Sequence, residues 1–264
     1  MTDAMRHIGD PLPDPWADLR RHTPARIALG RSGAGLPTHE VLRLAAAHAQ
    51  ARDAVHMALD VAALQADLAA AGLPCGPVLH SQAIDRATYL RRPDLGRLLA
   101  PASADALQAD EPVDLALVLA DGLSAVALQR HAVPLLQALH AALAGRLAIA
   151  RPVIALQARV ALGDPIGAAL QARLVLVLIG ERPGLSSPDS LGAYLTHAPK
   201  PGCHDAQRNC VSNIRPDGLA PALAAARLAW LVTEALRRRL TGVGLKDDSA
   251  TALLGATQPA IDTE

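Results

Sequence analysis

An uninterrupted run of six aliphatic residues, Leu174–Ile179, constrains the fold of this chain more than any other feature. Leucine and valine alternate along most of the run, which ends at Gly180, before the charged pair Glu181 and Arg182. Such a run is too short to cross a membrane, but it suits a strand buried on both faces of a sheet. Because ligands of parallel sheets bind beyond the carboxyl ends of the strands, we expect Gly180, Glu181 and Arg182 to lie on a binding rim.

Two further apolar runs repeat this pattern earlier in the chain. Residues 113–120 predict a strand, and the polar turn after them leads into a helix that extends to about His140. Residues 152–157 predict another strand, with a short helix after Gly163. A last helix, which Gly242 is suited to terminate, follows these elements. Strands that alternate with helices pair in parallel through right-handed crossovers, so the sequence predicts an α/β fold with a mainly parallel sheet.

The first hundred residues predict helices. Thr38 suits the N-cap of a helix beginning at His39, and neither proline nor glycine interrupts the chain from there to Ala71. This stretch forms one long helix or two shorter ones. Its apolar face and the segment Tyr89–Arg97 either bind a partner or pack within the chain, and the sequence does not decide between these alternatives.

Changes in composition divide the chain into four segments. Residues 1–100 predict a mainly helical N-terminal region, for which we expect contact with a partner. Residues 101–112 have few large apolar side chains and predict a linker. Residues 113–245 form the α/β domain. Residues 246–264 are mostly small and polar, and they predict a disordered tail.

Composition also disfavours several classes of function. Lysine plus arginine equals aspartate plus glutamate at 25 each, and aromatic residues are scarce, which disfavours nucleic-acid binding. No segment predicts a signal peptide or a membrane span. None of the ten histidines lies in a His-Glu-x-x-His frame, and no serine lies in a Gly-x-Ser-x-Gly elbow, so we expect neither a metal site nor a hydrolase. The three cysteines lack metal-ligand spacing and suit the reducing cytoplasm.

Glu181 and Cys210 are the candidate site residues that this pattern leaves. Glu181 either forms an exposed ion pair with a neighbouring arginine or accepts hydrogen bonds from a ligand at the strand end. Cys210 lies between polar residues in a predicted loop, although a buried structural thiol is the commoner role of a lone cysteine. The glycines within residues 30–35 lack the Gly-x-Gly-x-x-Gly order, so we interpret them as a turn and not as a nucleotide-binding loop.

Six strings occur in order along the chain, at residues 26–38, 89–97, 120–124, 159–160, 179–185 and 208–214. The most specific are Tyr-Leu-Arg-Arg-Pro-Asp-Leu-Gly-Arg from residue 89 and Ile-Gly-Glu-Arg-Pro-Gly-Leu from residue 179. Together they resemble the light, or small, subunit of ethanolamine ammonia-lyase, an adenosylcobalamin-dependent enzyme. The resemblance covers the chain from about Asp18 to Gly242.

This resemblance implies a division of labour between two kinds of subunit. The heavy subunit, an α/β barrel, holds ethanolamine and converts it to acetaldehyde and ammonia by radical chemistry. The light subunit covers part of the cobalamin with a Rossmann-like domain, here residues 113–245, and contributes no catalytic residue. Activity requires both subunits in a hetero-oligomer of heavy–light pairs. The sequence does not decide the assembly size, or whether the cytoplasmic enzyme lies within a bacterial microcompartment.

The cobalamin-binding positions of the family fall on Val160, Glu181 and Cys210. The resemblance implies that Glu181 accepts hydrogen bonds from polar groups of the cofactor, and that Val160 and Cys210 pack against it or present backbone to it. The chain departs from the family at Ala158, where a glycine is usual, and at Pro165, where an acid is usual. A nucleotide-binding α/β module and a non-catalytic scaffold are the alternative functions, and retention of cobalamin together with a large partner separates them from the leading one.

Overall fold

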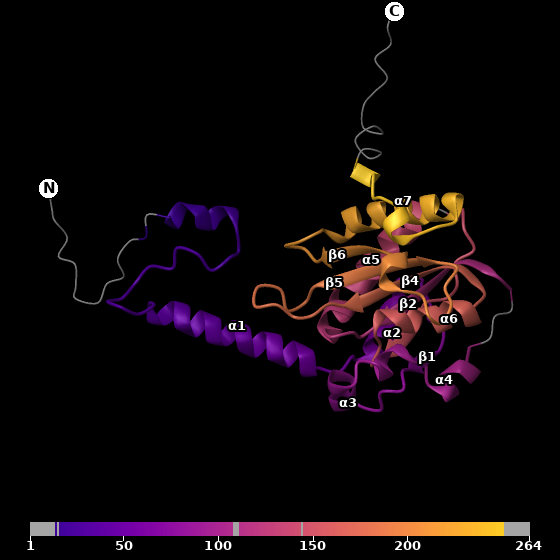
Figure 1. Cartoon of the computed structure of the whole chain (residues 1–264), viewed down its shortest axis with the longest axis horizontal. Helices are drawn as coiled ribbons and strands as arrows, with labels where there is room; N and C mark the ends of the chain where they lie inside the picture. The colour runs from indigo at the N-terminus through magenta and orange to yellow at the C-terminus, as the bar shows by residue number, and fades with distance from the viewer. Residues whose placement is uncertain (1–13, 15, 108–110, 144, 251–264) are drawn as a thin grey trace, which may run out of the picture.

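The computed structural model describes residues 14, 16–107, 111–143 and 145–250, and within them a six-stranded sheet forms the centre of the molecule (Figure 1). The strands are β1 (Val78–His80), β2 (Val113–Ala120), β3 (Val153–Leu156), β4 (Ala172–Gly180), β5 (Leu191–His197) and β6 (Arg208–Ile214). Four neighbouring strands in the order β1-β3-β2-β4 are parallel, whereas β5 and β6 extend the sheet in antiparallel fashion. The predicted α/β fold with a mainly parallel sheet is therefore confirmed.

Helices cover both faces of this sheet (Figure 1). The α-helices are α1 (Thr38–His56), α2 (Val61–Ala70), α3 (Arg86–Arg91), α4 (Pro101–Asp105), α5 (Ala125–Leu143), α6 (Gly163–Ala169) and α7 (Pro221–Arg238). Short 3-10 helices are η1 (Ala17–His22), η2 (Leu95–Arg97), η3 (Val160–Leu162), η4 (Asp205–Gln207) and η5 (Gly242–Gly244). Helices α5 and α7 pack together on one face of the sheet, whereas α6 packs on the other.

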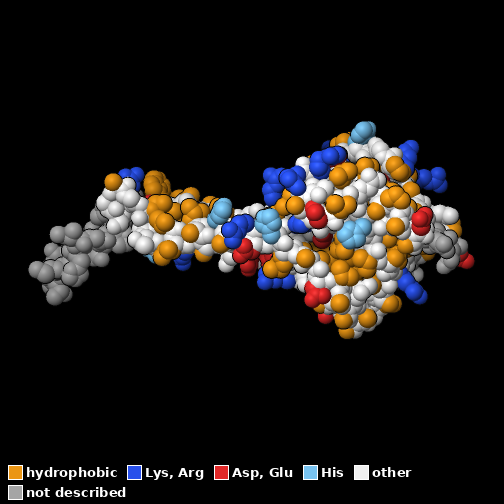
Figure 2. All heavy atoms as spheres, turned by 90° about the horizontal axis from the view of Figure 1, so that it is seen from below, with side chains coloured by type: hydrophobic (Ala, Val, Ile, Leu, Met, Phe, Trp, Pro, Cys, Tyr) orange, Lys and Arg blue, Asp and Glu red, His pale blue; other side chains and the backbone are white. Residues whose placement is uncertain are grey.

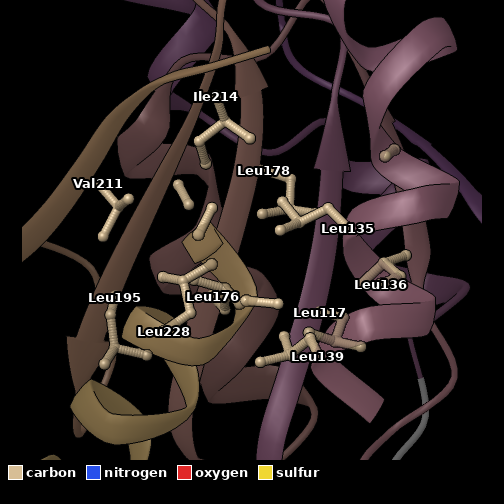
Figure 3. Packing of buried hydrophobic residues seen from close by; sticks show 14 of the residues in the cluster. Leu117, Leu135, Leu136, Leu139, Leu176, Leu178, Leu195, Val211, Ile214 and Leu228 are labelled. Atoms are coloured by element: carbon tan, nitrogen blue, oxygen red, sulfur yellow. The ribbon is translucent and has the colours of Figure 1, made fainter. Parts of the chain in front are cut away.

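The central strands are apolar on both sides, and two apolar layers therefore enclose the sheet. In β4, Leu176 and Leu178 face the layer formed with α5 and α7, whereas Val175 and Val177 face the layer formed with α6. Figure 3 shows leucines of the strands packed against leucines of α5 and against Leu228 of α7. Burial of each such side chain contributes roughly 1.5–3 kcal/mol, which explains why the alternating run forms an interior strand.

Three of the strands agree with the sequence prediction, whereas the sequence pattern does not predict the other three. Strands β2, β3 and β4 lie where apolar runs predicted them, and α5 and α6 follow β2 and β3. Strand β1 has three residues, and β5 and β6 contain polar positions, so none of these three shows a continuous apolar run. The expectation that Gly242 ends the last helix is wrong. Helix α7 ends at Arg238, because Arg239 adopts a left-handed conformation with φ 58°.

The N-terminal region contains two helices where the sequence allowed one or two. Helices α1 and α2 are separated by residues 57–60, and the Asp60 carboxylate caps α2 by accepting the N–H of Ala63 at 3.0 Å. Thr38 is the first helical residue and does not cap α1, because Pro37 occupies the cap position.

The arm, which we define as residues 16–56, projects from the sheet and exposes apolar surface. Figure 1 shows α1 leading away from the sheet, and Figure 2 shows apolar side chains along this projection. Three residues of α1 are buried, and one of them is Glu40, which pairs with Arg20 at 3.2 Å and Arg43 at 3.1 Å. Much of the apolar face of α1 is thus left uncovered by the described residues. The exposed apolar side chains of the arm include Trp16, Leu36, Val41, Leu42 and Leu44.

The segment predicted as a linker, residues 101–112, begins as a helix. Residues Pro101–Asp105 form α4, and its Ser103 hydroxyl accepts the N–H of His80 at 2.8 Å. The prediction that the whole segment is a linker is therefore wrong for its first part, because this contact packs the segment against β1. Residues 108–110 lie outside the described residues.

The sheet also begins earlier than residue 113, since β1 pairs in parallel with β3. At the other end of the chain, the tail predicted for residues 246–264 is described only to residue 250. Within that part, Asp247 forms an ion pair with Arg227 of α7 at 3.3 Å. The other residues of the predicted tail, 251–264, lie outside the described residues.

Candidate functional site

A cavity of about 430 Å³ opens at the carboxyl ends of β2, β3 and β4. The chain passes from β2 into α5 on one face of the sheet and from β3 into α6 on the other, so the two connections diverge. Such a divergence forms the crevice in which α/β sheets bind ligands. The rim expected from the sequence at Gly180, Glu181 and Arg182 is part of this cavity. Its lining residues are Tyr89, Leu123, Arg159, Val160, Ile179, Gly180, Glu181, Arg182 and Tyr194.

Two glycines allow the turns after β2 and β4 to approach closely beneath the cavity. The N–H of Leu123 donates to the carbonyl oxygen of Gly180 at 2.9 Å. A Cβ atom at Gly122, whose φ is +57°, would overlap with that same carbonyl, and a Cβ atom at Gly180 would overlap with the carbonyl of Ser124. Only glycine fits both positions, which fixes the floor of the cavity.

The carboxylate of Glu181 is held by groups just before β5 and within β6. Its Oε2 atom accepts hydrogen bonds from the hydroxyl of Ser190 and, at 3.2 Å, from the N–H of Asn213. Gly192 leaves the space that this carboxylate needs, because a Cβ atom there would lie 3.0 Å from Oε1. Glu181 forms no ion pair with an arginine of the described residues, so the interpretation as an exposed ion pair is wrong.

Val160 begins η3 in the loop after β3, and this loop is fixed from two sides. The carboxylate of Asp121 accepts the N–H groups of Gln157 at 3.0 Å and Ala158 at 3.1 Å. The hydroxyl of Tyr89 donates to the carbonyl oxygen of Ala158 at 3.0 Å. The N–H of Val160 has no hydrogen-bond acceptor among the described residues, so it is available to a ligand.

Two arginine side chains lie close to the ring of Tyr89 at the edge of the cavity. The guanidinium carbon of Arg86 lies 4.9 Å from the centre of the ring, and that of Arg159 lies 4.3 Å from it. Burial raises the pKa of Tyr89 to about 12. Because the Tyr89 side chain is fully buried, the segment Tyr89–Arg97 begins by packing within this chain. Burial also raises the pKa of Asp121, whose Oδ2 atom lies 3.7 Å from Arg86.

Cys210 lies in strand β6 and not in a loop, so that part of the sequence prediction is wrong. It stands opposite Tyr194 of β5, and β6 is the edge strand of the sheet. Tyr194 lines the cavity, and Cys210, which is exposed, is its direct neighbour on β6. Partial burial raises the pKa of the Cys210 thiol, against the opposing effect of the Tyr194 side chain. The thiol is therefore protonated at neutral pH.

The structure thus brings Val160 and Glu181 into one cavity and places Cys210 next to its wall. The described residues contain no group of three or more histidine, cysteine, aspartate or glutamate side chains that could hold a metal ion. In that part of the chain, no helix is both long and apolar enough to span a membrane.

Comparison with known proteins identifies the family. The model of the ethanolamine ammonia-lyase light chain matches residues 13–246. This chain belongs to that family. The ethanolamine ammonia-lyase small subunit of Bradyrhizobium diazoefficiens is 57% identical over 240 residues, which are 89% of this chain and 92% of that protein. The small subunit of Azotobacter vinelandii is 55% identical over 91% of each chain, and that of Pseudomonas syringae pv. tomato is 52% identical over 95% of this chain and 89% of its own.

Family membership alone does not show which residues besides Val160 and Glu181 line the cavity. Tyr89 and Arg159 occur in strings that resemble the family, but nothing in those strings shows that they meet. Tyr194 lies in β5, which has no strong sequence signal, so only the structure places it in the wall. Leu123 follows the Asp-Gly turn after β2, where a residue near the cavity is expected once that strand is known.

Proposed function

We propose that this chain is the light subunit of an adenosylcobalamin-dependent ethanolamine ammonia-lyase, and that its Rossmann-like domain holds part of the cobalamin. The observation that most supports the proposal is the shared cavity of Val160 and Glu181, with Cys210 next to the lining residue Tyr194. These are the residues that the family resemblance implies for cobalamin binding. A family light chain is expected to present them together, although they are far apart in the sequence.

The hydrogen-bonding groups of the cavity fit the amide side chains of a corrin ring. The Oε1 atom of Glu181 has no hydrogen-bond donor among the described residues, and we expect it to accept an amide N–H. The N–H of Val160 is correspondingly available to donate to an amide oxygen. Each hydrogen bond to a charged group contributes roughly 1.5–3 kcal/mol, so a small number of them suffices to orient the ring.

Adenosylcobalamin supplies the radical chemistry when it is bound, whereas this chain orients and shields it. The groups that react with ethanolamine belong, in this proposal, to the heavy subunit. The light chain contributes no catalytic residue. Cytoplasmic location, free or within a microcompartment, stays a prediction.

The arm is the part of the chain that we propose for contact with the heavy subunit. It projects from the sheet, and Leu42 is 63% exposed on α1 while Trp16 is 65% exposed near η1. Monomeric soluble proteins rarely expose clustered apolar residues in this way, and such clusters mark interaction surfaces. We expect the hetero-oligomer of heavy–light pairs to cover this face.

Cobalamin retention by the co-expressed heavy–light complex tests the proposed function. The complex and each subunit alone are dialysed against cyanocobalamin, and the bound corrinoid is measured by its absorbance. We expect the complex to retain clearly more cobalamin than the heavy subunit alone. Retention by the heavy subunit that does not change when this chain is added would contradict the proposal, and it would favour a scaffold without a cofactor.

A further inference from the structure

The cavity contains positive charge that the protein itself does not neutralise. Arg159 and Arg182 both line it, and Glu181 is the acidic residue among the lining residues. The Oε2 atom of Glu181 is already engaged by Ser190 and Asn213. Arg182 is exposed and forms no hydrogen bond or ion pair with the described residues. The wall therefore presents a guanidinium group without a partner to any molecule that enters.

Arg159 is held in place but keeps hydrogen-bond donors unused. Its guanidinium stacks on the ring of Tyr89, and its backbone N–H donates to the carbonyl oxygen of Gly96 at 2.8 Å. Gly96 also makes room for the stem, because a Cβ atom there would lie 2.9 Å from the Cγ atom of Arg159. The side chain makes one long hydrogen bond, from Nη2 to the carbonyl oxygen of Tyr89 at 3.4 Å, and its buried Nε has no acceptor.

A cation that is fixed before the ligand arrives binds an anion with little loss of side-chain entropy. A guanidinium group prefers planar recognition of phosphate or carboxylate oxygens, and its hydrogen bonds to them are about twice as strong as neutral ones. The amide side chains of a corrin ring are neutral. The phosphodiester in the nucleotide tail of cobalamin is the group of that molecule with a permanent negative charge.

We propose that Arg159 and Arg182 form an anion subsite that binds the phosphodiester of the cobalamin nucleotide tail. This inference rests on the proposed function and assigns a ligand group to two residues outside the set of Val160, Glu181 and Cys210. Such a subsite makes the light chain selective for complete corrinoids, because a corrinoid that lacks the nucleotide tail has no phosphodiester to bind there.

Comparison of two corrinoids tests the subsite. Equilibrium dialysis of the heavy–light complex measures binding of cyanocobalamin and of dicyanocobinamide, which lacks the phosphodiester and the nucleotide base. Arg182→Ala should weaken cyanocobalamin binding about tenfold and leave dicyanocobinamide binding unchanged. Arg182→Lys should recover part of the affinity. Arg151→Ala is the matched control, because Arg151 is also exposed and without a partner in the described residues but lies outside the cavity lining.

A second variant, Arg159→Lys, keeps the charge and loses the planar group that stacks on Tyr89. We expect the same selective loss for cyanocobalamin, with an unchanged unfolding midpoint for the variant complex. The proposal of an anion subsite is wrong if the complex that carries Arg182→Ala binds both corrinoids as tightly as the unchanged complex. It is also wrong if that complex loses the same affinity for both. In either case the proposed function stands. If the unchanged complex binds neither corrinoid, both the proposed function and the subsite are wrong.

Discussion

One carboxylate oxygen of Glu181 accepts hydrogen bonds from neighbouring residues, and the other has no donor among the described residues. Ser190 and Asn213 fix Oε2, and this leaves Oε1 in a defined position beside Gly192. The side chain is therefore oriented before any ligand binds, which reduces the entropy lost on binding. We therefore expect this partly exposed carboxylate to contribute more to cobalamin binding than a mobile surface acid does.

Substitution of Glu181 by glutamine tests this role at the cofactor. Glu181→Gln keeps the size of the side chain but removes the charge, and we expect cobalamin binding to the heavy–light complex to weaken about tenfold. Equilibrium dialysis measures the affinity. Glu111→Gln, an exposed change outside the cavity lining, is the matched control and should bind as the unchanged complex does. Equal affinities of the two variants would contradict the role of Glu181.

Cys210 provides a reporter of the cavity wall that needs no substitution. We expect bound cobalamin to slow alkylation of Cys210 by iodoacetamide, whereas Cys75 and Cys203, which do not line this cavity, are labelled equally with and without it. Peptide mass spectrometry of the labelled complex distinguishes the three thiols. Identical Cys210 labelling in both conditions would show that the cofactor does not reach this part of the wall.

The pH dependence of the same labelling reaction follows from the raised pKa of Cys210. The thiolate is the nucleophile, and partial burial disfavours it, so a smaller fraction of Cys210 reacts at a given pH than for an ordinary thiol. We expect the labelling rate without cobalamin to keep rising above pH 9, the region of an unperturbed thiol. A rate that levels off below that pH contradicts a raised pKa.

At the scale of elements, the approach of the turn after β2 to the end of β4 shapes the cavity floor. Gly122 and Gly180 are in contact there, and both are required because a Cβ atom at either would overlap with a carbonyl oxygen. The left-handed φ of Gly122 adds a second reason for glycine.

A pair of glycine substitutions separates these two reasons. In Gly122→Ala, the new side chain has an unfavourable left-handed φ and its Cβ atom also overlaps with a neighbouring carbonyl oxygen. In Gly72→Ala, the φ of +75° is equally unfavourable, but nothing lies within 4 Å of the added atom. We expect Gly72→Ala to lower the free energy of unfolding by roughly 1–2 kcal/mol. Gly122→Ala should lower it by roughly 1–3 kcal/mol more. Chemical denaturation measures both, and equal losses would contradict the close approach.

The sequence predicts well those elements whose burial is uniform, and it predicts poorly those that depend on neighbours. Strand β4 is recognisable because both of its faces are buried, so the apolar run is continuous. Strand β6 has polar and exposed positions along an edge, and for this reason the sequence around Cys210 predicts a loop. Of the site, the rim after β4 follows from the sequence alone. The meeting of Tyr89 with the loop after β3 does not, because it depends on contacts between segments 69 residues apart in the sequence.

At the scale of the whole molecule, the arm and the cavity carry the two surfaces on which the proposed function depends. The cavity opens at the carboxyl ends of the parallel strands, and the arm projects beyond the sheet with apolar side chains exposed (Figure 2). An apolar surface of this kind costs solubility unless another protein covers it. We therefore expect the arm to bind the heavy subunit.

A serine substitution on α1 tests the arm. Leu42→Ser should weaken co-purification with the heavy subunit, because it removes an exposed apolar side chain from the proposed contact. Leu223→Ser is the matched control on α7, where the leucine is 50% exposed. Circular dichroism should show unchanged helix content in both variants. A loss of heavy-subunit binding in Leu223→Ser and not in Leu42→Ser would place the contact elsewhere.

The measurement that tests the account most directly is ammonia release from ethanolamine by the reconstituted complex. The heavy subunit, this chain and adenosylcobalamin are assayed together and with each component left out. We predict ammonia and acetaldehyde only when all three are present. Ethanolamine turnover by the heavy subunit and adenosylcobalamin, unchanged when this chain is omitted, would contradict the assignment of this chain as the light subunit of the enzyme.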